Sequence, residues 1–425
     1  MMIWSGECGT LGEKEENVSS GTETGFLGPI PPPLPPPGRT TWTYIERQDM
    51  VARVAESLRA AMSLAIDVEF VQVRNRGPQD PAHKLALLQL AAASASQRAY
   101  VFDPLRLSDL SPLQAVFEDT SVLKLFHGIG ADAQVLATRG LTARHTLDLE
   151  AVSRSIFGTR ESSLQSMLQR ACGVRLDKSL QRSDWMRRPL TPAMLAYAAR
   201  DADMTLVLYS WLQQHYPWAI ALHEMTDNQA ASGVAAWILP FLESARPQRA
   251  DWAVAEAGLV GNHVEMLEEL RGALSAVHHP AQRARIVRLI TELDLTELAP
   301  DMRPLLEAPA ADVRAAAARS LGRLRDQAAE SALRALLHDP VQDVREACQN
   351  ALDHLGDVPS PASAHRPSHR SSAATWTSGE EGDGQPPASS WQAALLARFG
   401  TAPAAGDHSN AVMSPSVEKV DDPES

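Results

Sequence analysis

Two acidic residues, Asp67 and Glu69, lie two positions apart in the strongly apolar stretch Ser63–Val71. The stretch predicts a buried β-strand, in which alternate side chains point to the same face of the sheet. The two carboxylates therefore share a face and repel one another. A strand edge with solvated carboxylates is the other interpretation, but the apolar neighbours favour burial. Buried carboxylates need compensating charge, and a divalent cation supplies it.

Three further residues could take part in the same chemistry. Asp132 follows an apolar strand and a short turn that contains two glycines, so it lies in the first turn of a helix, where acids are also common for electrostatic reasons. Tyr197 and Asp201 are four positions apart on a predicted helix and thus share one of its faces. Each feature is ordinary alone. Because Asp132, Tyr197 and Asp201 follow the acidic pair in this order, the five residues together predict one site.

Three segments, Asp67–Glu69, His127–Asp132 and Tyr197–Asp201, resemble the three exonuclease motifs of the DEDD superfamily, in its tyrosine subclass. The resemblance is closer to ribonuclease D, because residues 124–132 and 178–201 are similar to that family's second motif and to the signature around its third. It implies a ribonuclease H-like mixed sheet with flanking helices, and 3′→5′ exonuclease activity on nucleic acid.

The resemblance also implies a role for each residue of the site. Two Mg²⁺ or Mn²⁺ ions about 4 Å apart would activate a water and stabilise the leaving oxygen. Asp67 would bridge both ions, Glu69 and Asp201 would complete the ion site of the attacking water, and Asp132 would bind the second ion through water. Tyr197 would orient the attacking water. The implied product is a 5′-nucleoside monophosphate released from the 3′ end.

Five residues near these motifs are candidates for substrate binding. His127 ends a predicted strand, where it either contacts substrate or is structural. Gln181 and Trp185 precede the third motif and could line the substrate channel, although Trp185 fits equally well as a core anchor. Arg187 and Arg188 belong to a basic run that either binds phosphates or forms a solvated face.

Composition divides the chain into four segments. Residues 1–39 are predicted to be disordered and end in a Pro-rich run, which forms either a stiff spacer or an SH3-type ligand. Residues 40–215 predict the exonuclease domain, and residues 216–356 an all-α domain. Residues 357–425 predict a second disordered segment. It contains a short amphipathic stretch, 390–399, which is either a partner-binding motif or a capping helix.

The helical segment repeats itself. Asp312-Val-Arg314 recurs as Asp343-Val-Arg345, 31 residues later, and apolar positions recur at the same spacing. This period is typical of stacked helix pairs that bury their faces on one another. The units resemble short HEAT repeats, with two clear copies and a weaker third at about 280–308. They stand where ribonuclease D usually has helical nucleic-acid-binding domains.

Charge is distributed unevenly over these segments. The whole chain carries a net charge of −13, residues 40–215 carry +2 and residues 216–355 carry −7. Metal binding by four carboxylates would leave residues 40–215 basic enough to attract a phosphate backbone. The acidic repeats are expected to bind a protein partner, and their removal is expected to leave activity on simple oligonucleotides intact.

The sequence therefore predicts a metal-dependent 3′→5′ exonuclease that acts on nucleic acid with a free 3′ end, with RNA favoured over DNA. The alternative is an inert exonuclease-like domain that serves a protein-binding HEAT scaffold. The presence of all four acids and the tyrosine argues against it. The polar stretch 74–81 leaves nucleotide preference open. The chain has three cysteines far apart in sequence and no recognisable signal peptide, which predicts a cytoplasmic protein. It has no apolar run of about 20 residues, which predicts that no membrane segment is present.

Overall fold

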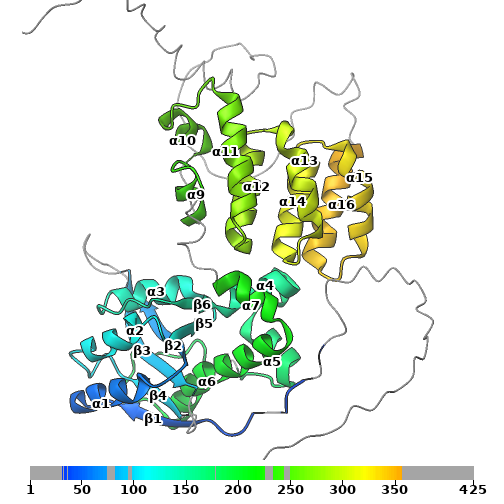
Figure 1. Ribbon diagram of the computed structural model, residues 1–425. Coiled ribbons are helices and arrows are strands. Elements are labelled where there is room, and N and C mark those ends of the chain that lie inside the picture. The colour runs from blue at the N-terminus through cyan, green and yellow to red at the C-terminus, as the bar shows by residue number, and fades with distance from the viewer. Residues whose placement is uncertain are drawn as a thin grey trace, which may run out of the picture.

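The computed structural model describes residues 31, 33–35, 37–73, 82–93, 98–177, 179–224, 233–243 and 249–356. Figure 1 shows an α/β unit followed by a purely helical unit. The stretch 74–81, the segment 390–399 and nearly all of both termini lie outside the described residues. Among the helices described, none has the length and apolar character needed to cross a membrane.

A mixed sheet of six strands forms the centre of the α/β unit, in the order β1-β4-β3-β2-β5-β6. Strand β3 runs antiparallel to both of its neighbours, and the remaining pairs are parallel. The strands are β1 (Thr41–Ile45), β2 (Ser63–Gln72), β3 (His83–Ala92), β4 (Arg98–Phe102), β5 (Leu123–Phe126) and β6 (Thr146–Asp148). The apolar stretches Ser63–Val71, Leu85–Ala91, Ala99–Asp103 and Val122–His127 predict the four central strands, whereas the edge strands β1 and β6 were not predicted.

Helices cover both faces of this sheet, which confirms the predicted fold class. One face carries α1 (Gln48–Leu58), α2 (Gln114–Glu118) and α3 (Ile129–Ala137), and the other carries α4 (Leu149–Phe157), α5 (Leu164–Cys172), α6 (Pro192–His215) and α7 (Pro217–Glu224). Alternate side chains of β2 pack against both helical layers, because Ile66 packs on the first face and Ala65 on the second.

Helix α6 lies across the middle of the sheet, where it contacts β2, β3 and β4. It begins at a capped end, since the Thr191 side chain accepts a hydrogen bond from the Met194 amide and Pro192 occupies the first turn. Its apolar face ends in Trp211, which is fully buried. This packing fixes the helix that carries the third sequence motif.

The helical unit is a stack of helix pairs, as the 31-residue period predicted. Helices α12 (Pro280–Glu292), α14 (Ala311–Arg323) and α16 (Gln342–Gly356) begin 31 residues apart and pack in that order. Their partners are α11 (His263–Ala276), α13 (Ala299–Met302) and α15 (Glu330–Ala335), preceded by the short helices α9 (Leu239–Glu243) and α10 (Ala250–Glu256). Gly322 permits the close approach of α14 to α16, because a Cβ at this position would lie 2.5 Å from the Ala351 Cα.

The arginine of each Asp-Val-Arg motif binds backbone carbonyls of the helical unit. Arg314 is almost fully buried, binds the Asp339 carboxylate at 2.8 Å and donates to the Ala308 and Pro309 carbonyls. Arg345 donates to the Asp339 and Pro340 carbonyls in the next repeat. These bonds satisfy carbonyls just before α14 and α16, so the arginines stabilise the turns that join the helix pairs.

Candidate active site

The acidic pair of β2 points to the face covered by α6. Asp67 and Glu69 alternate with Val68, which packs on the opposite side, and Tyr197 and Asp201 extend from α6 toward them. Carboxylate oxygens of Asp67, Glu69 and Asp201 lie within 4.8 Å of one another. Side chains separated by more than 130 residues of sequence therefore form one cluster.

Asp132 approaches this cluster from the first turn of α3. The turn before it is held by Asp148, whose carboxylate accepts hydrogen bonds from the Gly128 amide at 2.8 Å and the Glu150 amide at 3.0 Å. Gly128 has a φ of 92°, a conformation that favours glycine. Asp148 thus has a structural role, and the Asp132 charge raises the pKa of Asp67.

Burial raises the pKa of all four carboxyl groups, and repulsion from neighbouring carboxylates adds to this at Asp67, Glu69 and Asp132. Burial raises the pKa of Asp67 well above its usual value, and the charges of Asp201, Asp132 and Glu69 raise it further. Burial, with Asp201 and Asp132, raises the pKa of Glu69 to about 8. Burial raises the pKa of Asp132 to about 7 and that of Asp201 to about 6. The site concentrates negative charge, which Arg200 and the Tyr197 hydrogen bond offset only in part at Asp201.

These carboxylates fit divalent metal ions. Oxygen donors from carboxylates are the ligands that Mg²⁺ and Mn²⁺ prefer, and no thiolate or imidazole belongs to the cluster of three. The charged groups that act most strongly on Asp67 are all carboxylates, so a cation would remove the repulsion. Asp67, Glu69 and Asp201 could share one ion, with Asp132 available to a second.

Tyr197 borders the carboxylates with its hydroxyl hydrogen-bonded to Asp201. Burial, the nearby carboxylates and this bond raise the pKa of the phenol, so it remains protonated at neutral pH and can donate a hydrogen bond. The Trp185 ring lies 6.0 Å from the Tyr197 ring and is 3% exposed. Trp185 is therefore a core anchor beneath Tyr197, one of the two roles predicted for it.

A pocket of about 310 Å³ opens beside this cluster. Two of the candidate substrate residues, His127 and Gln181, line it. Arg187 is exposed, and neither it nor Arg188 belongs to the pocket lining. The sequence reasoning did not predict the other side chains around the pocket, which are Glu150, Ser163, Leu164, Gln165, Leu176 and Thr205.

His127 has a structural contact as well as a place in the pocket. Its Nε2 lies 3.0 Å from the Ser162 carbonyl oxygen, so this nitrogen carries the proton and donates it. Burial lowers the pKa of the imidazole, which is therefore neutral at neutral pH. The ring joins the end of β5 to the residues that precede α5, and these residues form one wall of the pocket.

Arg188 has a structural role, which differs from the phosphate contact that the sequence suggested. Its guanidinium binds both Asp103 carboxylate oxygens at 2.6 Å and donates to the Ala86 carbonyl at 2.9 Å. Burial raises the pKa of Asp103, but hydrogen bonds from Arg188 and Tyr44 outweigh it and hold this pKa below its usual value. The ion pair ties the segment before α6 to the sheet.

Replacing Arg188 with methionine is expected to lower the free energy of unfolding by about 3 kcal/mol, because the buried Asp103 carboxylate loses the guanidinium that binds both of its oxygens. Urea denaturation measures the change. Arg187→Met is the matched control, since the neighbouring side chain is exposed, and a change below about 0.5 kcal/mol is expected there. Equal losses in the two variants would contradict the assigned role.

Gln89 is a buried polar residue that the sequence reasoning missed. It lies directly opposite Asp67 on β3 and is fully buried. Within the described residues, neither its amide nitrogen nor its amide oxygen has a hydrogen-bond partner. The available signal was one amide in the otherwise apolar stretch Leu85–Leu90. An unpaired buried amide is costly, and here it lies beside the carboxylate cluster.

Comparison with known proteins identifies both units. Residues 42–216 match the family model of 3′-5′ exonuclease domains, and residues 267–353 match that of HEAT repeats. The chain carries a ribonuclease D-like exonuclease domain followed by HEAT repeats. The exonuclease domain contains every residue of the carboxylate cluster, so the cluster belongs to the matched segment.

Two curated relatives illustrate the similarity of the exonuclease domain. Ribonuclease D of Escherichia coli is 34% identical over 161 residues, which are 38% of this chain and 41% of that protein. Exosome complex component 10 of Mus musculus is 28% identical over 194 residues, which are 45% of this chain and 21% of that protein. The chain thus spans less than half the length of either relative.

Among solved structures, a crystal structure of Escherichia coli RNase D matches 84% of this chain and 97% of its own, with 21% identity and a TM-score of 0.41. A Trypanosoma brucei RNase D complex with RNA U12 matches 44% of this chain and 68% of its own, with 23% identity and a TM-score of 0.39.

Proposed function

We propose that the protein is a metal-dependent 3′→5′ exonuclease that hydrolyses phosphodiester bonds from the 3′ end of RNA and releases 5′-nucleoside monophosphates. The observation that carries this proposal is the convergence of Asp67, Glu69 and Asp201, with Asp132 beside them, in a half-buried site where the carboxylates repel one another. Such a cluster destabilises the fold, so its presence calls for a function.

Two Mg²⁺ or Mn²⁺ ions, when bound, would activate the attacking water and stabilise charge on the leaving oxygen. The chain's residues have the remaining tasks. Asp67, Glu69 and Asp201 would hold one ion, and Asp132 with Asp67 would be available to the second. The Tyr197 hydroxyl donates its one proton to Asp201 in the metal-free site and would orient the water once Asp201 binds metal. The high pKa of the phenol excludes it as a base at neutral pH.

The pocket suits a terminal nucleotide. Its volume of about 310 Å³ is comparable to small-ligand sites, and polar side chains from Ser163, Gln165 and Gln181 surround it. RNA is favoured because the relatives of this domain include proteins named ribonuclease D, and a 2′-hydroxyl group could bond to such side chains. The HEAT repeats are proposed to bind a protein partner, as their net acidity disfavours nucleic acid.

Substrate preference can be measured with three substrates of one sequence: single-stranded RNA, single-stranded DNA and RNA with a base-paired 3′ end. With Mn²⁺ present, single-stranded RNA is expected to be shortened about tenfold faster than DNA, the effect of one or two lost hydrogen bonds to the 2′-hydroxyl. Equal rates on RNA and DNA would reject the RNA preference. No degradation of any substrate would favour an inert domain that serves a HEAT scaffold.

A further inference from the structure

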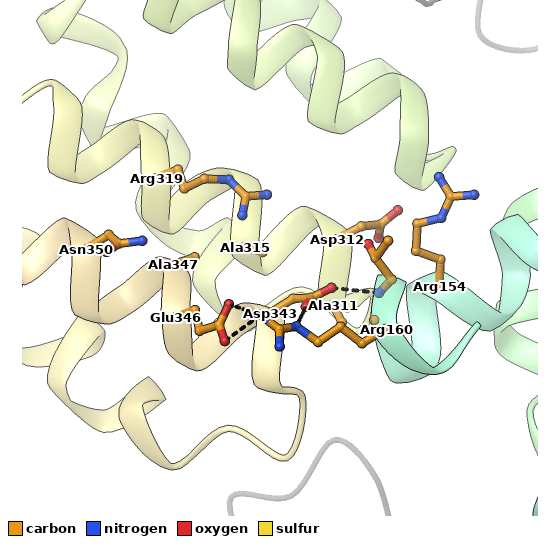
Figure 2. A pocket seen from close by; sticks show the side chains of 12 residues that line it. Arg154, Arg160, Ala311, Asp312, Ala315, Arg319, Asp343, Glu346, Ala347 and Asn350 are labelled. Atoms are coloured by element: carbon orange, nitrogen blue, oxygen red, sulfur yellow. Dashed lines mark hydrogen bonds and ion pairs between the residues drawn. The ribbon is translucent and has the colours of Figure 1, made fainter. Parts of the chain in front are cut away.

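The HEAT repeats contact the exonuclease domain through equivalent residues. Asp312 and Asp343 are 31 residues apart, and each is the second residue of its helix, α14 or α16. Both carboxylates face the end of α4 and the 3₁₀ turn Thr159–Glu161 that follows it (Figure 2). In α12 the equivalent position is Ala281, so only the last two repeats present this carboxylate.

Each carboxylate accepts a hydrogen bond from the exonuclease domain. The buried Ser155 hydroxyl lies 3.2 Å from both Asp312 carboxylate oxygens. The Thr159 amide donates to the Asp343 carboxylate at 2.6 Å. One guanidinium nitrogen of Arg160, Nη2, donates to both Glu346 carboxylate oxygens at 2.8 and 2.9 Å; this pair is exposed and therefore contributes less.

The two domains also approach each other closely at Gly158. A Cβ at this glycine would lie 2.7 Å from the Val341 Cγ1 atom and 3.0 Å from an Asp343 carboxylate oxygen. Residue 158 has a φ of 82° as well, so glycine is required there for two independent reasons. The backbone at the end of α4 is thus fitted to the surface of the last HEAT repeats.

A cavity of about 380 Å³ adjoins these contacts, between the two domains. Its charged lining is balanced, with arginines at 154, 160 and 319 and acids at 312, 343 and 346 (Figure 2). A phosphate or another ion would meet charges of both signs there. The cavity is therefore part of the joint between the domains and not a separate ligand site.

The segment held by the repeats continues directly into the wall of the catalytic pocket. Three residues after Arg160, the chain reaches Ser163–Gln165, whose side chains line the pocket. Between them, the Ser162 carbonyl accepts the His127 hydrogen bond, and the Ser162 hydroxyl donates to the Thr159 carbonyl at 3.1 Å. Thr159 is thus bonded to a HEAT repeat on one side and to the pocket wall on the other.

We propose that Asp312 and Asp343 are positioning residues of the exonuclease reaction, through which the last two HEAT repeats hold the pocket wall Ser162–Gln165 in place for the terminal nucleotide. The proposal rests on the proposed function and reverses the expectation that the repeats are dispensable for activity. The four carboxylates stand on β2, α3 and α6, and none of them is among the contact residues Ser155, Thr159 and Arg160, so affinity for metal is expected to be independent of the repeats.

The test is the double variant Asp312→Ala/Asp343→Ala of the full chain. Titration with a 5′-nucleoside monophosphate in the presence of Mn²⁺ is expected to show about tenfold weaker binding, and kcat/KM for a single-stranded RNA is expected to fall by a similar factor. Affinity for Mn²⁺ alone is expected to stay unchanged. Hydrogen exchange of the amides at 159–165 is expected to become faster.

Two variants control for indirect effects. Asp301→Ala breaks a solenoid ion pair with Arg271 and should leave nucleotide binding unchanged. Asp312→Asn/Asp343→Asn keeps an acceptor oxygen at each position and should restore most of the lost affinity. Unchanged binding and exchange in the alanine variant, or a parallel loss of Mn²⁺ affinity, would overturn the proposal. An inactive wild type would reject the proposed function, while exchange would still report whether the repeats hold this wall.

Discussion

Replacing Asp67 with asparagine is expected to lower the rate of mononucleotide release by about 10³-fold or more, because single electrostatic contacts in a transition state already contribute 10²–10³-fold. The same change is expected to stabilise the metal-free protein by about 1–2 kcal/mol, because it removes one of several carboxylates that repel one another in a buried site. Opposite signs for activity and stability distinguish a catalytic residue from a structural one.

Release of labelled mononucleotide and urea denaturation in a chelator measure the two effects. Tyr197→Phe is the graded control, since it keeps all four carboxylates and loses only the hydroxyl. About 10²-fold lower activity is expected for it, the effect of a mispositioned reactant, with Mn²⁺ affinity unchanged. An Asp67→Asn variant that remains active, or that is both inactive and less stable than wild type, would contradict the assigned role.

Stability of the metal-free protein is expected to fall as pH rises from about 5 to about 8. Glu69, with a folded-state pKa of about 8, and Asp132, at about 7, hold protons in the folded state that the unfolded chain has already released. Raised carboxyl pKa values therefore stabilise the folded state at low pH, and this contribution is lost as the pH rises through the folded-state pKa. Each extra proton corresponds to about 1.4 kcal/mol per pH unit.

Thermal or urea unfolding in a chelator, followed at several pH values, measures this trend. Added Mn²⁺ is expected to remove most of it, because the metal replaces the protons and binds the ionised carboxylates. Glu69→Gln, which cannot titrate at this position, is expected to flatten the slope. A metal-free stability that rises with pH over this interval would contradict the electrostatics assigned to the site.

The chemistry of the site was predictable because its residue types contradict their surroundings. Asp67 and Glu69 are acids in a strand whose neighbours are apolar, and a period of two residues is enough to place them on one face. Tyr197 and Asp201 share a face of a long helix for the same kind of reason. Local periodicity carried these expectations, and the fold confirms that the elements exist.

What sequence could not supply is the long-range environment of each side chain. Arg187 and Arg188 are neighbours in one basic run, yet one is exposed and the other binds Asp103, 85 residues away. The Asp-Val-Arg repeat was visible in the sequence, but the different partners of its aspartate and its arginine were not. Arg314 binds within the solenoid, whereas Asp312 binds Ser155, 157 residues away, in the other domain. Such partners depend on tertiary packing and leave no local pattern.

One measurement tests the central claim most directly: digestion of a single-stranded RNA whose 3′-terminal nucleotide alone carries the label, with purified protein and Mn²⁺. The label is expected to appear from the first time point as a 5′-nucleoside monophosphate, and chelation of the metal should stop its release. Label that remains in full-length RNA, or that first appears in fragments longer than one nucleotide, would contradict a metal-dependent 3′→5′ exonuclease.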